Sequence, residues 1–275
     1  MQIQTLINSA ISQLNSDTPR LDAEVLLAFV LNKPRVYLRT WSDKYVNNEQ
    51  LNIFSDLIQQ RIQGIPIAYL TGTREFWSRE FKITPDVLIP RPDTELLIEL
   101  CLDLIKNQTM SVLDLGTGSG IIAITLAADC PSIKMLAVDK SESALMVAKY
   151  NAEQYQLTNI EFCQSDWFST IAKQRFDLIV SNPPYIADDD EHLNQGDVRF
   201  EPKTALIADN QGLSDIQHIA NNARDYLNNN GYLLVEHGYN QAESVQQIFN
   251  NAGYKAIKTY HDLSGQARVT CGQKI

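Results

Sequence analysis

The sequence of 275 residues lacks several features that mark common protein classes. No apolar run approaches the ~20 residues that a membrane-spanning helix needs. The opening stretch "MQIQTLINSAISQLNSDTPRLDAEVLL" has no basic start followed by a continuous apolar block, so it predicts an amphipathic helix and not a signal peptide. No internal repeat and no low-complexity tract is present. These absences favour a cytoplasmic globular protein without a membrane anchor.

Potential metal ligands and disulfide-forming residues are scarce. The four cysteines contain no CxxC pair: Cys101, Cys130, Cys163 and Cys271. Isolated cysteines in a chain of this length favour reduced core thiols. The four histidines show no metal-binding spacing such as HExxH: His192, His218, His237 and His261. We therefore expect no metal site.

The sequence also lacks an excess of positive charge, since its formal net charge is −10. Residues 1–80 carry eight basic and eight acidic side chains, so the whole net charge falls on residues 81–275. Binding to a phosphate backbone depends on Lys and Arg, which makes direct nucleic-acid binding a poor prediction. A net negative region suits a basic protein partner, although solubility alone also explains it. The acidic run from Asp188 to Glu191 has the same two interpretations.

The hydrophobic pattern predicts three consecutive regions. Residues 1–64 place apolar side chains at three- and four-residue steps in "LINSAISQL", "RLDAEVLLAFVL" and "NEQLNIFSDLIQQRI", which indicates a helical domain. Either Asn47 or Asn48 caps the third of these helices. Residues 65–90 alternate and are rich in aromatic and β-branched residues from about Ile67, which predicts a linking strand pair. Residues 91–275 form the third region.

In the third region, strands and helices alternate from "SVLDLG" to "ARVTCG". Such alternation predicts an α/β fold in which a mainly parallel sheet is covered on both faces. The last two strands, "YKAIKTYHD" and "ARVTCG", are joined by a short link and are therefore expected to be antiparallel.

A glycine-rich loop follows the first of these strands in "VLDLGTGSGII", residues 112–122. Its pattern is GxGxG and not the GxGxxG of dinucleotide sites. Asp114 lies just before the loop, where a carboxylate repels phosphate and suits an ammonium group. The candidate ligand-binding residues here are Asp114, Gly116, Thr117, Gly118, Ser119 and Gly120.

Acidic residues also end the next two strands. Asp139 closes "LAVD", where an acid can accept hydrogen bonds from ribose hydroxyls. Asp166 closes "QSD" with Trp167 beside it, which offers an adenine edge a polar partner and an aromatic neighbour. Each residue alone has a structural explanation as a helix cap, a turn or a core side chain. Their ordered combination predicts a site for S-adenosyl-L-methionine, which has an amine, a ribose diol and an adenine but no phosphate.

The fourth strand of the region, "FDLIV", runs into "SNPPY", residues 181–185. Two prolines remove backbone donors and stiffen the chain at this point. Asn182 Oδ1 and the Pro183 carbonyl can each accept one N–H of a planar –NH2 group, which aligns a weak nucleophile. Tyr185 can pack flat against that group. Pro184 completes the predicted acceptor site.

Four motifs together resemble one known family. "DLGTGSG", "NPPY", "LIPRPDTE" and "GDVRFEP" are similar to those of the bacterial protein-(glutamine-N5) methyltransferases, above all the release-factor glutamine methyltransferases. The resemblance covers nearly the whole chain and shows no departure at the motif positions. "NPPY" is shared with DNA adenine-N6 methyltransferases, whereas "LIPRPDTE" and "GDVRFEP" are much more specific.

The resemblance implies a Rossmann-like class I methyltransferase sheet of seven strands with a small N-terminal helical bundle that docks the protein substrate. It implies that S-adenosyl-L-methionine is the cofactor and that class I peptide chain release factors are the partners, methylated at the glutamine of a Gly-Gly-Gln loop. No direct nucleic-acid or membrane contact and a monomeric state are expected. For four residues of the specific motifs, a loop-ordering salt bridge and a substrate contact both stay open: Arg91, Glu95, Arg199 and Glu201.

Three other functions are compatible with parts of this pattern. A ribosomal-protein glutamine methyltransferase would share the site chemistry. An adenine-N6 nucleic-acid methyltransferase would require a basic face or a target-recognition domain, which the acidic region 81–275 does not predict. A non-catalytic adaptor that binds the cofactor would not be expected to keep Asn182 and both prolines.

Overall fold

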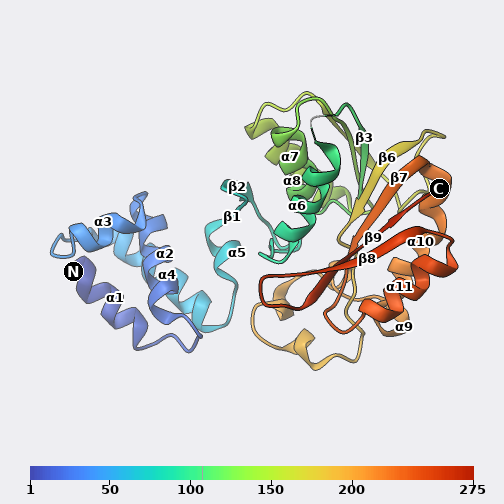
Figure 1. Ribbon diagram of the computed structural model, residues 1–275. Helices are drawn as coiled ribbons and strands as arrows, with labels where there is room; N and C mark the ends of the chain where they lie inside the picture. The colour runs from blue at the N-terminus through green and yellow to red at the C-terminus, as the bar shows by residue number, and fades with distance from the viewer. Residues whose placement is uncertain (107) are drawn as a thin grey trace. The chain divides into compact units, whose positions relative to one another are not determined.

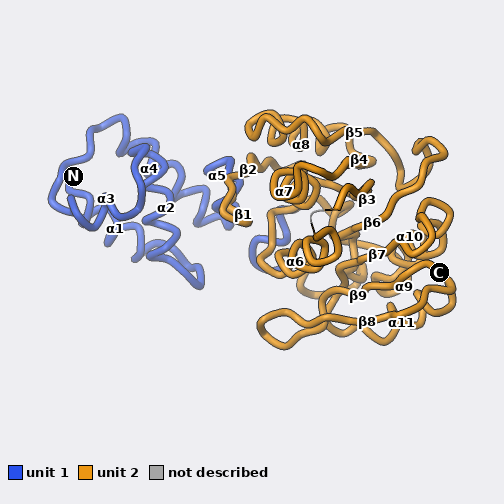
Figure 2. Tube along the Cα trace, turned by 45° about the horizontal axis from the view of Figure 1, so that its top comes forward, with its two compact units in different colours: residues 1–73, 194–200 blue, residues 74–193, 201–275 orange. Residues whose placement is uncertain are grey.

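The computed structural model describes residues 1–106 and 108–275 and divides the chain into two compact units. Unit 1 contains residues 1–73 and 194–200, and unit 2 contains residues 74–193 and 201–275 (Figure 2). The three consecutive regions expected from the sequence include no such discontinuous segment. Residues 194–200 therefore belong by their packing to unit 1, although the chain on both sides of them belongs to unit 2.

Unit 1 is helical, as its apolar spacing predicts. Its longest helix begins at a capping box, because Asn47 Oδ1 accepts from the Gln50 amide at 2.8 Å while the Gln50 side chain accepts from the Asn47 amide. This geometry identifies Asn47 as the cap. The helices of unit 1 are α1 (Ile3–Ile11), α2 (Pro19–Leu31), α3 (Arg35–Thr40), α4 (Asn48–Ile62) and α5 (Ile67–Thr71).

Two short helices of unit 1 differ from the sequence prediction. The segment from Ile67 was expected to begin a strand pair, but α5 occupies it and the strands begin only at Thr73. Pro66 precedes this helix and Gly72, at φ 73°, ends it, so local backbone geometry outweighs the β-branched composition. Helix α3 was not anticipated, since Asn32 and Pro34 indicated only a turn. The core of the unit consists of buried apolar side chains from α1, α2, α3 and α4, among them Ile3, Leu26, Leu38 and Phe54.

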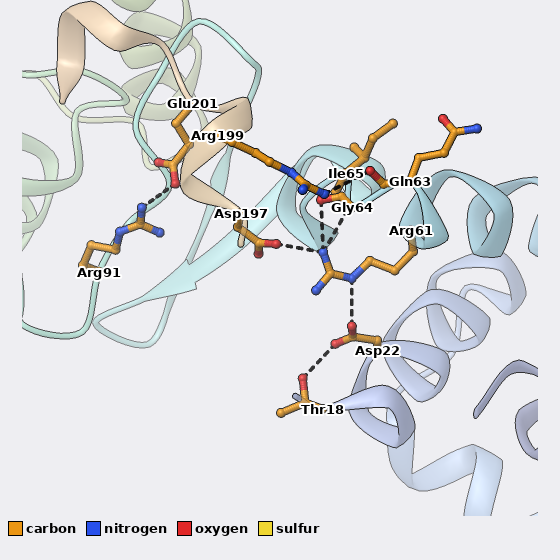
Figure 3. A network of polar contacts seen from close by, with 10 residues as sticks. All are labelled: Thr18, Asp22, Arg61, Gln63, Gly64, Ile65, Arg91, Asp197, Arg199 and Glu201. Carbon is orange, nitrogen blue, oxygen red and sulfur yellow. Dashed lines mark hydrogen bonds and ion pairs between the residues drawn. The ribbon is translucent and has the colours of Figure 1, made fainter. Parts of the chain in front are cut away.

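Segment 194–200 is held within unit 1 by a nearly buried arginine. The Arg61 side chain is 11% exposed, and its Nε donates to Asp22 while one terminal nitrogen donates to Asp197, both at 2.8 Å (Figure 3). The Arg199 guanidinium donates to the Gln63 carbonyl oxygen at 3.2 Å. A charged side chain at this depth is stabilised by such pairing. Arg61 thus ties the segment to the end of the helical bundle.

Unit 2 is built on a seven-stranded sheet with the strand order β5-β4-β3-β6-β7-β9-β8. Strands β3 to β7 are parallel, and β9 is antiparallel to both β7 and β8, as the short link between the last two strands predicted. The sheet consists of β3 (Ser111–Leu115), β4 (Lys134–Asp139), β5 (Ile160–Gln164), β6 (Phe176–Ser181), β7 (Leu227–Glu236), β8 (Lys255–His261) and β9 (Ala267–Gln273). A separate hairpin of β1 (Thr73–Phe76) and β2 (Arg79–Lys82) precedes it.

Helices cover both faces of this sheet (Figure 1). One face carries α6 (Thr94–Ile105), α7 (Ile121–Asp129) and α8 (Glu142–Gln154), and the other carries α10 (Ser214–Tyr226) and α11 (Ala242–Asn251). The continuous apolar runs of β3 and β6 have no exposed surface at Leu113 and Ile179, which is expected of central parallel strands. The predicted α/β architecture with a seven-stranded sheet is confirmed. The remaining short helices lie after β6: η1 (Glu191–Asn194), η2 (Val198–Phe200), η3 (Lys203–Ala205) and α9 (Asp209–Gly212).

All four cysteines are free, and Cys101, Cys130 and Cys271 are buried while Cys163 is half-buried. Across residues 1–106 and 108–275, no group of three or more His, Cys, Asp and Glu side chains is arranged to hold a metal ion. None of the helices in those ranges has the length and apolar content that crossing a membrane requires.

Candidate active site

A cavity of about 450 Å³ lies in unit 2 at the carboxyl ends of β3, β4 and β6, the position at which open parallel sheets bind ligands. Most of the residues predicted from the sequence line it: Gly116, Thr117, Gly118, Ser119, Asp139, Asp166, Trp167, Asn182 and Pro184. The predicted residues outside the lining are Asp114, Gly120, Pro183 and Tyr185. The structure thus gathers the motifs around one cavity and places these four residues behind its wall.

The glycine loop turns sharply from β3 into α7. Gly116 has φ 72°, and its amide and that of Thr117 both donate to the Val138 carbonyl at 2.9 Å, which ties the loop to β4. Gly120 has φ 86°, and a Cβ at this position would lie 2.6 Å from Ile124 Cδ1. Glycine is therefore required at the start of α7 by both backbone conformation and space.

Asp114 is buried beneath this loop with no exposed surface. Its Oδ2 accepts a hydrogen bond from Thr117 Oγ1 at 2.7 Å, whereas Oδ1 finds no partner in the described part of the chain. Burial raises the pKa of Asp114 to about 7. In the structure its carboxyl group orients Thr117 in the cavity wall, and the expected contact between Asp114 and a ligand amine stays a prediction.

Asp139 lines the cavity at the end of β4 and organises the backbone there. Its two carboxylate oxygens accept from the amides of Gly118 at 2.9 Å and Ser141 at 2.8 Å. Burial raises the pKa of Asp139. A carboxylate has about four acceptor positions, so both oxygens keep capacity for the hydroxyl groups of a ligand.

Asp166 and Trp167 follow β5 and differ sharply in their surroundings. The Asp166 side chain is 53% exposed and forms an ion pair with Lys140 at 3.2 Å. Trp167 has φ 51°, and Ser165 Oγ donates to its carbonyl oxygen at 2.7 Å, which stabilises this left-handed backbone. Its ring lies over Gly116, where an added Cβ would meet it at 3.4 Å. Trp167 therefore forms a rigid wall beside the glycine loop, while Asp166 stands at the solvent edge.

Asn182 lies beside the glycine loop because β6 pairs with β3, and Ser181 Oγ donates to the Leu115 carbonyl at 2.7 Å. The Asn182 side-chain nitrogen donates to Thr94 Oγ1 at 3.2 Å. Thr94 begins α6 and has no exposed surface. Asn182 lines the cavity, and the contact between its amide oxygen and a ligand there stays a prediction.

The next residues of this motif face the interior. Pro183 is buried, and the Tyr185 ring packs against the core while its hydroxyl donates to Glu236 Oε1 at 3.4 Å. Burial raises the pKa of Tyr185 above its usual range. Gln241 also donates to the Tyr185 carbonyl at 2.9 Å. Tyr185 does not belong to the lining of the cavity, and stacking of its ring on an acceptor group stays a prediction.

Sequence reasoning missed Thr94 and Glu236, both fully buried beneath the "NPPY" segment. Asn182 donates to the Thr94 hydroxyl, and Thr94 also lines the cavity. Glu236 ends the apolar run "YLLVE" of β7, and an acid that closes a buried strand next to β6 was the available signal.

One wall of the cavity is fixed by an ion pair between the two most specific motifs. The Arg91 guanidinium donates to Glu201 Oε1, and Glu201 Oε2 accepts from the Ile89 amide at 3.0 Å (Figure 3). Glu201 is 4% exposed, and Arg91 lines the cavity. The loop-ordering salt bridge considered for Arg91 and Glu201 is therefore present. Glu95 instead accepts from the Trp77 amide at 3.4 Å in the hairpin turn.

The charges of the lining favour a cationic ligand. Four acidic residues line the cavity, Asp86, Asp139, Asp166 and Asp215, against the two cations Arg91 and Lys140. Lys140 is already paired with Asp166, and Arg91 with Glu201. The glycine loop therefore offers no unpaired lysine or arginine to a phosphate group. The cavity volume of about 450 Å³ lies in the range of small-molecule sites.

Comparisons with known proteins agree with this geometry. The family model described as a methyltransferase domain matches residues 106–274, and that of the PrmC N-terminal domain matches residues 3–72. The release factor glutamine methyltransferase of Aliivibrio fischeri is 47% identical, with 100% of this chain and 98% of that protein covered. The protein of that name from Shewanella oneidensis is 48% identical, with 94% and 91% covered.

The fold is also found among solved structures. A crystal structure of a methyltransferase from Pyrococcus furiosus superposes with a TM-score of 0.57 at 16% identity, covering 80% of this chain and 98% of that chain. At this identity the likeness shows the fold alone. Together with the two family matches it confirms the predicted class I methyltransferase fold with an additional N-terminal domain.

Proposed function

The chain belongs to the family of release factor glutamine methyltransferases, and from this premise we propose that it methylates the side-chain amide nitrogen of the glutamine in the Gly-Gly-Gln motif of class I peptide chain release factors. The methyl donor is S-adenosyl-L-methionine. The observation that carries the proposal is the position of Asn182 in the cavity lining, with its side-chain nitrogen donating to the buried Thr94.

The residues of the cavity fit S-adenosyl-L-methionine. The glycine loop, Asp139 and Trp167 would hold it, with Asp139 accepting from the ribose hydroxyls and Trp167 bounding the adenine side. The excess of acidic lining residues suits its two positive charges. When bound, this group supplies a methyl carbon that is activated toward nucleophiles by the adjacent sulfonium.

Asn182 and Pro183 compensate for the low nucleophilicity of the glutamine amide nitrogen. The lone pair of an amide nitrogen is delocalised, so the nitrogen becomes nucleophilic only if its environment favours charge growing on it. Asn182 Oδ1 and the Pro183 carbonyl accept its two N–H groups and hold them in one plane, which orients the nitrogen and stabilises developing positive charge. No strong base is needed, because the nitrogen releases its proton to water only after its bond to the methyl carbon has formed.

The two units divide recognition between them in this proposal. Unit 1 matches the PrmC N-terminal domain and docks the body of the release factor, since a single glutamine loop offers little surface. The acidic part of the chain, residues 81–275, suits basic surface near the loop. The protein acts as a monomer in the cytoplasm and contacts neither nucleic acid nor membrane directly.

The proposal is tested by incubating the protein with labelled S-adenosyl-L-methionine and a class I release factor. Label should enter the intact release factor and be absent from its variant in which the Gly-Gly-Gln glutamine is alanine. Equal labelling of both would overturn the proposal. Intact ribosomes serve as the comparison substrate, because labelling of ribosomes with none of the release factor would indicate the ribosomal-protein glutamine methyltransferase instead.

A further inference from the structure

We propose that Asn151 is a positioning residue for the cofactor: its buried amide fastens the glycine loop to strand β2 and so sets the distance between two walls of the cavity. The inference rests on the proposed function, because S-adenosyl-L-methionine is the ligand proposed there. Asn151 lies outside the cavity lining, so it acts only through the backbone groups that it holds.

The Asn151 side chain is buried inside α8, where an apolar residue would be expected. It is 1% exposed, and asparagine is unfavourable within a helix because its amide competes for backbone hydrogen bonds. Ala148, one turn earlier, would lie 3.2 Å from a Cβ placed at Gly120, so this face of α8 packs closely on the glycine loop. A buried amide destabilises the fold unless it is hydrogen-bonded, so its partners show what it holds in place.

Both N–H groups and the oxygen of the Asn151 amide form hydrogen bonds, and all three partners are backbone groups. Oδ1 accepts from the Lys82 amide at 2.8 Å, and Nδ2 donates to the Lys82 carbonyl at 3.1 Å and to the Ser119 carbonyl at 2.9 Å. Lys82 precedes Asn151 by 69 residues and Ser119 precedes it by 32. A single side chain therefore joins the end of β2 to the glycine loop.

At the glycine loop, Asn151 supplies an attachment that the sheet does not provide. Strand β4 holds residues 116–118 through the Val138 carbonyl and the Asp139 side chain. Ser119, the next residue, lines the cavity, and its carbonyl is held from α8 instead. Because the peptide group is planar, a fixed carbonyl also fixes the orientation of this part of the cavity wall.

At β2, Asn151 holds the near end of a second wall of the same cavity. Residues between positions 86 and 91 line the cavity just after Lys82, and the ion pair of the two specific motifs holds the far end of this stretch (Figure 3). Tyr155 adds a second attachment of β2 to the end of α8, because its hydroxyl donates to the Glu80 carbonyl at 2.6 Å. The near end of this wall is thus positioned by α8.

The Asn151 amide and the ligand should therefore affect each other in both directions. A cofactor that contacts both walls binds most tightly when the walls keep the distance that the folded cavity has. Loss of the amide lets the two walls move independently and lowers the affinity. By thermodynamic reciprocity, a bound cofactor should make the attachment of Lys82 to Asn151 harder to open.

The first test removes the Asn151 amide. Calorimetry should show that Asn151→Ala raises Kd for S-adenosyl-L-methionine about 5- to 30-fold, the range of an ordinary coupling between sites. At saturating cofactor, kcat should stay within about threefold, because the residues at the acceptor are unchanged. An unchanged Kd would overturn the inference.

Asn159→Ala is the matched control for a loss of stability alone. Asn159 is a partly buried asparagine whose Nδ2 donates to the Ala127 carbonyl at 3.0 Å, and it directly precedes β5, at the edge of the sheet opposite the cavity. Both variants should lower Tm by several degrees, since each leaves a backbone carbonyl without its donor. Only Asn151→Ala should change Kd, and an equal rise of Kd in both variants would overturn the inference.

The second test uses the wild-type protein, so it does not depend on the folding of a variant. S-adenosyl-L-methionine at about 100 times its Kd should slow hydrogen exchange of the Lys82 amide at least tenfold, because opening of this attachment then requires loosening of the ligand. The Gly265 amide, which donates to the Asp262 carbonyl at 2.9 Å in the turn between β8 and β9, should exchange at an unchanged rate. A Lys82 rate that does not respond to the ligand would overturn the inference.

Cofactor affinity and hydrogen exchange are both measured without a release factor. The inference and the proposed function can therefore fail separately. A wild-type enzyme that binds the cofactor and methylates no glutamine would overturn the proposed function instead.

Discussion

The two halves of the cavity each rest on one buried carboxyl group, and the two groups differ in where their partners come from. Asp114 lies beneath the glycine loop and Glu236 beneath the "NPPY" segment, both without exposed surface and both with a pKa that burial raises to about 7. The partner of Asp114 is Thr117, three residues along the chain, whereas Tyr185 is 51 residues from Glu236. Around these two acids the cofactor half is thus built locally, and the acceptor half is assembled by the sheet.

This difference has a consequence for function. The cofactor half is made mainly of backbone amides and glycines arranged around Asp139, so its residues determine how tightly the cofactor binds. The acceptor half is made of side chains that orient one amide group, so its residues determine the rate of transfer. Substitutions in the two halves should therefore separate cofactor affinity from kcat.

The largest effect is expected at Asn182. Asn182→Ala removes one of the two acceptors that align the substrate nitrogen, and kcat should fall by about 10³-fold, near the upper range for one preorganised hydrogen-bonding group. Calorimetry should show Kd for S-adenosyl-L-methionine within a few-fold of wild type. If cofactor affinity fell as steeply as turnover, Asn182 would be a cofactor ligand and the two halves would not be separable.

A smaller effect is expected at Asp139, where substitution should weaken cofactor binding and leave kcat nearly unchanged. Asp139→Ala removes the acceptor of two backbone amides and of the ribose hydroxyls, so Kd for the cofactor should rise about 10- to 100-fold, the loss typical of hydrogen bonds to a charged group. At saturating cofactor kcat should stay within a few-fold. Asp166→Ala is the matched comparison, because its exposed carboxylate should contribute less than about threefold. Equal effects of the two variants would contradict the importance of burial.

Two substitutions in the glycine loop should affect different properties, one mainly the stability of the fold and the other mainly cofactor binding. Gly120→Ala places a Cβ 2.6 Å from Ile124 at a positive φ, and we expect a loss of about 2–3 kcal/mol, seen as a fall in Tm of several degrees. Gly118→Ala adds a methyl group to open space in the cavity wall, so it should cost about 1 kcal/mol in stability and mainly weaken cofactor binding. Similar melting temperatures for the two variants would show that the close contact of a Cβ at Gly120 with Ile124 does not destabilise the fold.

The smallest effect concerns the pH dependence of stability. Each of the two buried acids has a folded-state pKa of about 7, above its unfolded value, so the native state keeps a proton that the unfolded chain has lost. Unfolding free energy should therefore fall as pH rises from about 4 to 7. Urea titrations at pH 5.5 and 8 should show that Asp114→Asn removes about 1–2 kcal/mol of this decrease.

Glu236→Gln should flatten the pH dependence of stability to a similar extent, because burial raises the pKa of Glu236 to about 7 as well. The same fall in unfolding free energy between pH 5.5 and 8 in this variant and in the wild type would contradict that expectation.

Local patterns in the sequence account for most of the fold and for the cofactor half. Hydrophobic periodicity predicted the alternating strands and helices, and the motif "GTGSG" predicted a tight glycine-rich loop. Helix α5 was mispredicted because Pro66 and Gly72 define a short helix within a β-rich composition. Segment 194–200 could not be assigned to unit 1, since Asp197 reaches Arg61 only through tertiary packing.

The acceptor half was predicted only in part for the same reason. "NPPY" identified Asn182 by its chemistry, but the hydrogen bond to Thr94 joins residues 88 positions apart that only tertiary packing brings together. Tyr185 was expected to pack flat against the acceptor group, which stays a prediction, and the hydrogen bond from its hydroxyl to Glu236 was not anticipated. Asp114 and Asp166 were both predicted to contact the ligand, yet Asp114 is fully buried whereas the Asp166 side chain is 53% exposed. No local pattern encodes how deeply a side chain will lie.

The most direct test of the account is to map the methyl group on a release factor after reaction with the wild-type enzyme. Tandem mass spectrometry of the proteolysed release factor should find one added methyl group on the side-chain amide of the Gly-Gly-Gln glutamine. After the same reaction with the Asn182→Ala variant at saturating cofactor, the release factor should carry almost no added methyl group. A methyl group on any other residue, or undiminished methylation by Asn182→Ala, would contradict the assignment of the acceptor site.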